Sequence, residues 1–319
     1  MLKRDTTFVV LGSQADRSTV YQKMLREAAR PACVIFETIA AADSFAAEIG
    51  CRVYTSKERP VARQAIWRAC LNRESIVISA TRQGVLLPNL GVLIIDEPDR
   101  FGLRNDQQPR YHTAAVARWR SKHQQVGSMV GTAALSVYTT LLLNGGASLV
   151  GRGPISVVRP IDPRNIDVTP DDLVVLANRT LYGSYPQASE KPVSQIEQLT
   201  EHWKRAWLIG FDELAGIPEY NQQEIIYMKL QRLRYVADEV LVPTKSPEHI
   251  IFKPIFIDHE IRQRKQFGFP PFGRIAKITE PAGATYVKQF PGSANPARVL
   301  DQLNLPKGAR VEFDPMHIL

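Results

Sequence analysis

The sequence lacks the features that mark several large classes of protein. Its three cysteines, Cys33, Cys51 and Cys70, form no CxxC pair. A structural zinc site needs about four converging ligands, so we predict no zinc or other metal site, and an odd cysteine count is typical of a reducing compartment. No apolar run is long enough to span a bilayer, and the apolar stretch near the N-terminus is too short for a signal peptide. We therefore expect a cytoplasmic protein with no membrane partner.

Positive charge is the main compositional bias. The chain of 319 residues has a formal net charge of +8, with 44% hydrophobic and 23% charged residues. These proportions are typical of a soluble globular protein, and the length suggests two domains and a small third one. The excess of Lys and Arg favours a polyanionic partner such as nucleic acid. A basic surface that is simply solvated explains the same number.

Residues 1–150 alternate between strand and helix patterns. Short apolar runs predict strands at 7–11, 32–37, 52–54, 75–79, 91–96 and 127–131. Amphipathic or Ala-rich runs predict helices at 18–29, 39–49, 60–71, 113–123 and 136–143. Apolar strands that alternate with helices indicate a parallel sheet covered on both faces, with ligands at the carboxyl ends of the strands.

Glycines between residues 145 and 153 mark a break, after which the pattern is less regular. A smaller α/β unit is expected, with strands at 173–176, 207–211 and 239–242, helices at 194–205 and 222–235, and a loop at 186–192. From about residue 258 a charged helix at 258–266 leads to the aromatic turn Phe267–Gly273. Strands at 274–279, 285–289 and 309–313 and a helix at 296–303 are expected to follow.

The sequence contains, in this order, LPNLGVLIIDEPD, PRYH, EVLVPTKSPEH and FGFPPFGRIA, and these motifs resemble those of the primosomal helicase PriA family. Ile76–Arg120 contains LPNLGVLIIDEPD and PRYH, in the order and spacing of that family. Trp207–Pro270 contains EVLVPTKSPEH and leads into FGFPPFGRIA, and Val311–Leu319 (VEFDPMHIL) resembles the closing strand of the family. The resemblance covers roughly residues 7–150 and 205–319.

This resemblance implies the architecture of a superfamily two helicase that acts in replication restart. The expected fold is α/β: a RecA-like P-loop helicase lobe at 1–150, a reduced second α/β lobe at 151–256, and a small α+β C-terminal domain at 257–319. The implied partners are forked or single-stranded DNA and other replication or primosome proteins, in the cytoplasm and at the nucleoid.

The phosphate-binding loop departs from the family pattern. A working loop reads G-x-x-x-x-G-K-[ST], whose lysine reaches the phosphates and whose hydroxyl binds Mg²⁺. Here Gly12 is followed by Asp16 at the second glycine, Arg17 at the lysine and Ser18 at the hydroxyl. We predict that Asp16 caps the following helix and that a triphosphate is not held. Arginine is a planar fork and does not replace a lysine.

Two further nucleotide motifs are partly kept. Asp96 and Glu97 stand at the acidic motif, where they are suited to hold Mg²⁺ and orient a water molecule. A purely structural role at the strand end explains them equally well. Gly131 and Thr132 stand at the motif that couples hydrolysis to lobe movement. In the helix that carries the family's arginine finger the glycines are absent, and only Arg232 and Arg234 remain.

Positive and aromatic side chains remain as candidate DNA contacts. In the family an aromatic-rich loop senses DNA, and stacking of bases on rings beside arginines is how single strands are held. Tyr111 and His112 are as compatible with locking this loop onto the next helix. The candidate DNA-binding residues are Arg104, Arg110, Tyr111, His112, Arg262, Arg264, Lys265 and Arg274.

The leading hypothesis is a PriA-like, DNA-binding pseudo-helicase that needs no cofactor and has lost, or nearly lost, its ATPase. The first rival is an active, divergent ATP-dependent helicase, which would use ATP and Mg²⁺ at Arg17, Ser18, Asp96 and Glu97. The second rival is a replication scaffold that binds other proteins and no DNA.

Overall fold

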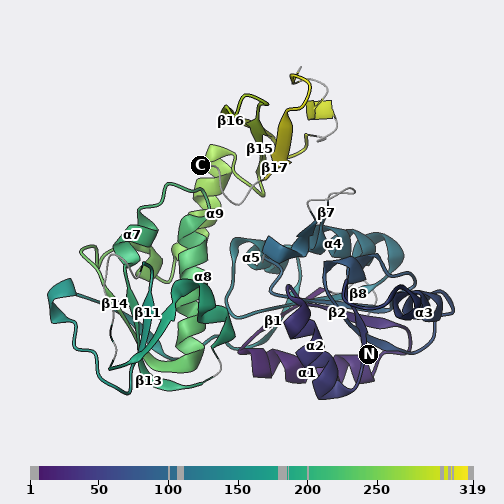
Figure 1. Cartoon of the computed structure of the whole chain (residues 1–319), viewed down its shortest axis with the longest axis horizontal. Coiled ribbons are helices and arrows are strands. Elements are labelled where there is room, and N and C mark those ends of the chain that lie inside the picture. The colour runs from purple at the N-terminus through teal and green to yellow at the C-terminus, as the bar shows by residue number, and fades with distance from the viewer. Residues whose placement is uncertain are drawn as a thin grey trace. The chain divides into compact units, whose positions relative to one another are not determined.

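The computed structural model describes residues 7–99, 101–105, 111–178, 185, 187–199, 201–294, 298–300, 303 and 305–314. The chain divides into two compact units, residues 1–154 and 155–319. The first is built on a seven-stranded sheet, and the second contains a five-stranded and a three-stranded sheet (Figure 1).

The first sheet has the strand order β3-β4-β2-β5-β8-β1-β9, and each pair of neighbours is parallel. Its strands are β1 (Thr7–Leu11), β2 (Ala32–Ile35), β3 (Arg52–Tyr54), β4 (Val77–Ala80), β5 (Val92–Asp96), β8 (Gly127–Thr132) and β9 (Ser148–Gly151). Its helices are α1 (Gln14–Arg26), α2 (Ile39–Ile49), α3 (Pro60–Leu71), α4 (Thr113–Gln124) and α5 (Val137–Asn144). The 3₁₀ helices η1 (Arg82–Leu86) and η2 (Phe101–Leu103) and the short pair β6 (Arg104–Asn105) and β7 (Tyr111–His112) complete it.

Helices cover both faces of this sheet, because successive strand residues point to opposite sides. Val10 packs with α1 and α2 in one core, whereas Val9 packs with α3, α4 and α5 in the other. Figure 1 places α1 and α2 on one side of the sheet and α4 and α5 on the other. The predicted parallel α/β class is confirmed, and the arrangement is consistent with a RecA-like lobe.

One strand of the seven-stranded sheet was not predicted. The expected break at 145–153 contains β9, which extends the sheet by pairing with β1. Gly151 makes the approach possible, because a Cβ there would lie 2.1 Å from the carbonyl oxygen of Leu11 and its φ is +90°. Gly151 is therefore the last residue of β9, and its lack of a side chain lets this edge strand pair with β1.

The second unit contains a smaller parallel sheet of order β10-β14-β13-β11-β12. Its strands are β10 (Val157–Ile161), β11 (Leu173–Leu176), β12 (Ser189–Pro192), β13 (Trp203–Ile209) and β14 (Ala237–Pro243). Its helices are α7 (Phe211–Ala215), α8 (Gln222–Val236) and α9 (Phe256–Phe267), with 3₁₀ helices η3 (Pro163–Asn165), η4 (Val193–Gln198) and η5 (Ile250–Phe252).

Helices cover one face of this second sheet. Residues of α7, α8 and α9 pack on Leu173, Val175 and Leu208. In the described residues, the opposite face, with Trp207 at its centre, is covered by side chains that precede β11 and β12. The smaller α/β unit expected after the first one is therefore present.

Two sequence expectations for this unit are wrong. The predicted helix 194–205 is the short η4 followed by the start of β13, because β13 is a central strand paired on both sides, by β11 and by β14. The expected loop 186–192 contains β12, which pairs with β11. In both cases strand pairing in the tertiary fold overrides the local pattern.

The C-terminal sheet is antiparallel, with β15 (Gly273–Thr279) between β16 (Thr285–Pro291) and β17 (Arg310–Phe313). Of the helix predicted at 296–303, residues 298–300 are helical, and residues 296, 297, 301 and 302 lie outside the described residues. Helix α9, expected to open this domain, buries Phe256 and Ile257 in the core of the second sheet. The helix is therefore part of the second lobe at its N-terminal end.

Candidate functional site: the carboxyl edge of the first sheet

Helix α1 begins at the turn where a phosphate-binding loop is expected. Ser13 is its N-cap: the Ser13 hydroxyl accepts from the backbone N–H of Asp16 at 3.2 Å, and the Asp16 carboxylate accepts from the Ser13 N–H at 3.1 Å. The predicted capping role of Asp16 is confirmed. This reciprocal pair satisfies N–H groups that an anion would use, and it adds a negative charge at the helix start.

Arg17 is buried, with 4% of its surface exposed, and its guanidinium faces the acidic motif. Nε lies 2.8 Å from Oδ1 of Asp96, Nη2 lies 3.0 Å from Oε1 of Glu97, and Nη1 donates to the carbonyl oxygen of Gly12 at 2.8 Å. Burial opposes the charge of Arg17, but the two carboxylates outweigh burial and raise its pKa. The structure thus places Arg17 with both acidic residues in one closed ion-pair cluster.

Tyr21 completes this cluster, and the sequence interpretation did not include it. Its hydroxyl donates to Oδ1 of Asp96 at 2.7 Å, and burial and the Asp96 carboxylate raise the pKa of Tyr21. Tyr21 is four residues after Arg17 and so lies on the same face of α1. That spacing is the signal in the sequence that could have identified it.

Gly131 explains how side chains of α1 reach β5. Strand β8 lies between β1 and β5, so Arg17 and Tyr21 cross over its end to reach Asp96. A Cβ at position 131 would lie 1.5 Å from the Tyr21 hydroxyl oxygen and 3.0 Å from Cδ of Arg17. Gly131 is therefore a requirement of the ion-pair cluster.

The remaining nucleotide-motif residues have internal partners. The Ser18 hydroxyl donates to Glu48 of α2 at 3.2 Å, and the Thr132 hydroxyl donates to the carbonyl oxygen of Ala134 at 2.6 Å. Glu97 has a φ of +53°, donates its N–H to Gly131 at 2.7 Å, and accepts from the N–H of Ala133 at 3.2 Å. Each of these contacts joins two groups of the protein at or near this edge of the sheet.

The candidate DNA contacts of the aromatic loop have structural partners where they are described. His112 is the N-cap of α4, where its Nδ1 accepts from the N–H of Ala114 at 3.2 Å. Tyr111 packs against the first core, and Arg104 lies in β6. Arg110 lies outside the described residues. These contacts favour the alternative in which Tyr111 and His112 fix the loop to α4.

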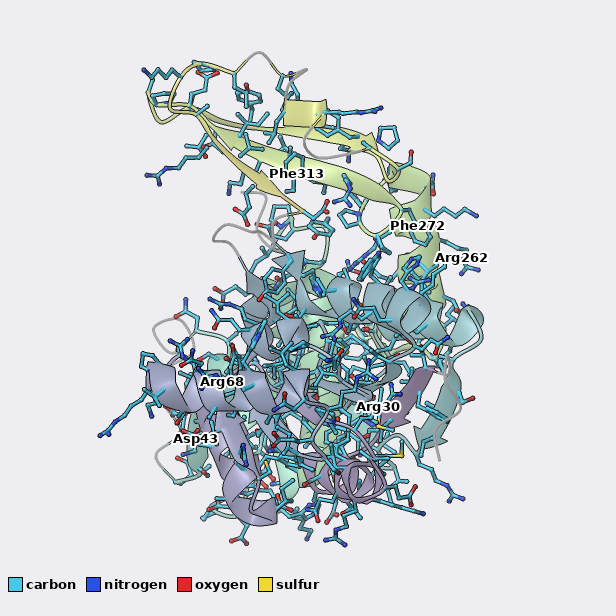
Figure 2. All side chains as sticks on the ribbon, turned by 90° about the vertical axis from the view of Figure 1, so that its right-hand side faces the viewer. Arg30, Asp43, Arg68, Arg262, Phe272 and Phe313 are labelled. Carbon is cyan, nitrogen blue, oxygen red and sulfur yellow. The ribbon has the colours of Figure 1, made fainter. Side chains whose placement is uncertain are left out.

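Three of the four C-terminal candidates are at least partly exposed, and the fourth, Arg264, is buried. Arg262 and Lys265 are exposed, and Figure 2 labels Arg262 on α9. Arg274 is half-buried and donates to Asp314 at 3.0 Å.

Arg264, in contrast, is buried between Glu224 at 2.7 Å and Glu260 at 2.8 Å. Burial opposes its charge, but the two carboxylates raise its pKa. The structure therefore gives Arg264 a role in joining α8 to α9, which differs from the exposed DNA contact that the sequence suggested.

Comparison with known proteins gives partial and weak likenesses. No protein-family model matches the chain. A stretch of 69 residues, 21% of this chain, is 32% identical to the replication restart protein PriA of Bacillus subtilis and covers 9% of that protein. The match is confined to that stretch, and the chain spans a small part of the length of this relative.

Solved helicase structures have a similar arrangement at low identity. The DUF1998 helicase MrfA bound to DNA is 13% identical, with a TM-score of 0.46 over 80% of this chain and 46% of that one. RecG bound to a three-way DNA junction is 12% identical, with a TM-score of 0.44 over 82% and 44% of the two chains. At such values the likenesses assign neither activity nor substrate.

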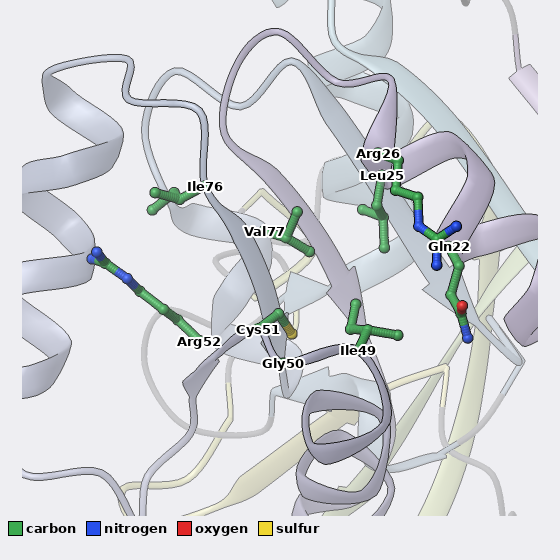
Figure 3. A pocket seen from close by; sticks show the side chains of 9 residues that line it. All are labelled: Gln22, Leu25, Arg26, Ile49, Gly50, Cys51, Arg52, Ile76 and Val77. Carbon is green, nitrogen blue, oxygen red and sulfur yellow. The ribbon is translucent and has the colours of Figure 1, made fainter.

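A pocket of about 310 Å³ lies away from the ion-pair cluster, where the last turns of α1 and α2 meet the first residues of β3 and β4. Leu25, Ile49 and Val77 form apolar walls, and Arg26 and Arg52 approach from different sides (Figure 3).

Within the described residues, no cluster of three His, Cys, Asp or Glu side chains is placed to bind a metal ion, and no helix is long and apolar enough to cross a membrane.

Proposed function

We propose that this protein is a helicase-like, nucleic-acid-binding protein of replication restart that does not hydrolyse ATP. One observation carries the proposal: the Arg17 guanidinium is buried between Asp96 and Glu97 and bonded to Gly12. In a working site these carboxylates hold Mg²⁺ and a water molecule, and a lysine at this position meets phosphate. Here the Arg17 guanidinium occupies the place of both the magnesium ion and the lysine side chain.

The residues present do not fit a magnesium nucleotide. Asp96 would have to release Arg17 and Tyr21 to bind Mg²⁺, which would leave a buried guanidinium without its partner. Asp16 would remain at the helix start, where its charge repels phosphate. Nucleic-acid binding has no such requirement, because phosphate contacts need positive side chains on an accessible surface. The net charge of +8 supports that part of the proposal.

Calorimetry with Mg-ATP and an ATPase assay with forked DNA test the loss of hydrolysis. We expect no saturable heat of binding and no turnover above that of a sample without protein. Asp96→Asn is the informative variant, and Asp43→Asn on α2, remote in sequence from the motif, is the matched control. DNA-stimulated turnover that Asp96→Asn abolishes and Asp43→Asn retains would establish the active-helicase alternative.

Fluorescence polarisation with labelled forked and single-stranded DNA, repeated over a range of salt concentrations, tests the nucleic-acid partner. We expect binding at low salt that weakens as salt rises, because released counterions drive phosphate contacts. Absence of binding at low salt would favour the interaction scaffold instead.

A further inference from the structure

One helical layer of the first unit carries no negative charge. The helices that pack on the Val9 side of the sheet, α3, η1, α4 and α5, contain no Asp or Glu. Between Asp106 and Asp162 the sequence has no acidic residue at all. On the other face, α1 carries Asp16 beside its cations, and α2 carries Asp43 and Glu48. An anion that approaches the first layer meets no carboxylate on its helices.

Helix α4 gathers the positive charge of this layer on its outer face. Arg118, Trp119, Lys122 and His123 are exposed, whereas Ala114, Ala117 and Arg120 are buried. At 3.6 residues per turn the four exposed residues share one side of the helix. Arg120 does not belong to this face, because its guanidinium is bonded to the carbonyl oxygens of Val85 and Leu87.

Trp119 is the feature that a merely solvated helix does not explain. Its surface is 54% exposed, and its ring lies against that of His123, with 5.1 Å between the centroids. Among the described residues, neither Arg118 nor Lys122 forms a salt bridge. The two cations lie four residues apart, about 6 Å along the helix axis, and both lie on the side of Trp119 that is away from His123.

We propose that the outer face of α4 binds single-stranded nucleic acid, with a base stacked on Trp119 and phosphates held by Arg118 and Lys122. An aromatic ring beside two cations is suited to an unpaired strand, because each base offers a ring face and each phosphate a charge. The absence of carboxylates removes the repulsion that such a strand would otherwise meet. This inference rests on the proposed nucleic-acid binding and assigns a site to it that lies outside the nucleotide motifs.

The test uses the whole chain and a labelled, unpaired oligonucleotide in a salt titration. The double variant Arg118→Glu with Lys122→Glu is compared with Lys23→Glu and Arg26→Glu, two exposed cations of α1. Both pairs change the net charge equally. We expect only the α4 pair to lower the dependence of log affinity on log salt, by about 1.4 for two contacts to a single strand.

Trp119→Ala is expected to weaken binding roughly tenfold, and Trp119→Phe by less, because stacking on an aromatic ring is removed or reduced. Trp67→Ala on α3 is the matched control, since Trp67 is the other exposed tryptophan among the described residues. Circular dichroism of each variant separates loss of binding from loss of fold.

The outcomes distinguish this inference from the proposed function. Binding by the wild type that both charge pairs weaken equally, or that Trp119→Ala leaves unchanged, overturns the α4 site and leaves nucleic-acid binding standing. No binding by the wild type overturns both. Displacement of the oligonucleotide by polyglutamate of matched charge, as effective as displacement by an unlabelled strand, assigns the face to acidic protein partners and overturns the stacking proposal.

Discussion

The two helical layers of the first sheet differ in the carboxylates that accompany their cations. In the α1 and α2 layer, Arg17 is buried and forms ion pairs with Asp96 and Glu97, so its charge is neutralised inside the protein. In the α3 to α5 layer, cations such as Arg118 and Arg68, which Figure 2 labels, remain exposed and no helix supplies a carboxylate. Charge that is paired internally maintains structure, and charge left at the surface is available to a partner.

The largest change in the free energy of unfolding is expected at Asp96, so this residue gives the strongest test of the difference between the two layers. Asp96→Ala removes the main partner of Arg17 and the acceptor of the Tyr21 hydroxyl. The buried guanidinium then keeps only Glu97, and loss of a carboxylate from a buried ion pair lowers the free energy of unfolding by at most about 3–5 kcal/mol. Urea denaturation measures this value. Asp43→Ala, an exposed carboxylate of α2, should change it by less than about 0.5 kcal/mol; equal effects would mean that the cluster is not closed.

Gly131→Ala should have the next largest effect. The added Cβ meets the Tyr21 hydroxyl oxygen, so the cluster has to shift, at a cost of about 1–3 kcal/mol in the free energy of unfolding. Thermal denaturation measures the loss. Tyr21→Phe in the same chain removes the oxygen that collides and should recover part of it. If the double variant loses as much stability as the two single variants added together, the contact between position 131 and the Tyr21 hydroxyl is contradicted.

Ser13→Ala tests the start of α1. Loss of the Ser13 hydroxyl removes the N-cap acceptor for Asp16 and should destabilise the protein by about 1 kcal/mol. Thermal denaturation of Ser13→Ala beside Ser13→Asp measures it, because aspartate can also cap a helix. An unchanged midpoint for Ser13→Ala would show that the turn is held by other contacts.

The smallest change in stability is expected on α4. Arg118→Ala and Lys122→Ala should alter the free energy of unfolding by less than about 0.5 kcal/mol, because both side chains are exposed. Chemical denaturation of the two variants checks this value. A loss as large as that of Asp96→Ala would assign these residues to the fold and remove the contrast between the layers.

Local patterns predicted most of the first unit. The residues of α2, α3 and β3 have the bounds that the sequence indicated, since Thr38 and Gly50 cap α2 and Pro60 begins α3. These signals act within a few residues, so they can be interpreted without the tertiary fold.

The choice of ion-pair partners was not predictable in the same way. Arg264 and Arg262 lie on the same charged helix, yet one is buried between two glutamates and the other is exposed. Glu224 is distant in sequence and meets Arg264 only after α8 packs beside α9. The sequence put Arg17 in the turn after the first strand, whereas it lies in the first turns of α1, and its contact with Asp96 depends on Gly131 between them. Such contacts are fixed by strand order, which a single helix pattern does not contain.

The bonds of the Arg17 guanidinium to three residues have a mechanical consequence. They fasten the end of β1, through Gly12, and the end of β5, through Asp96 and Glu97, to the same helix. A motor must pass between at least two arrangements of comparable free energy at this edge. A tie that is costly to release leaves a single arrangement, so we expect this lobe to act as a rigid platform whose shape is the same before and after a strand binds.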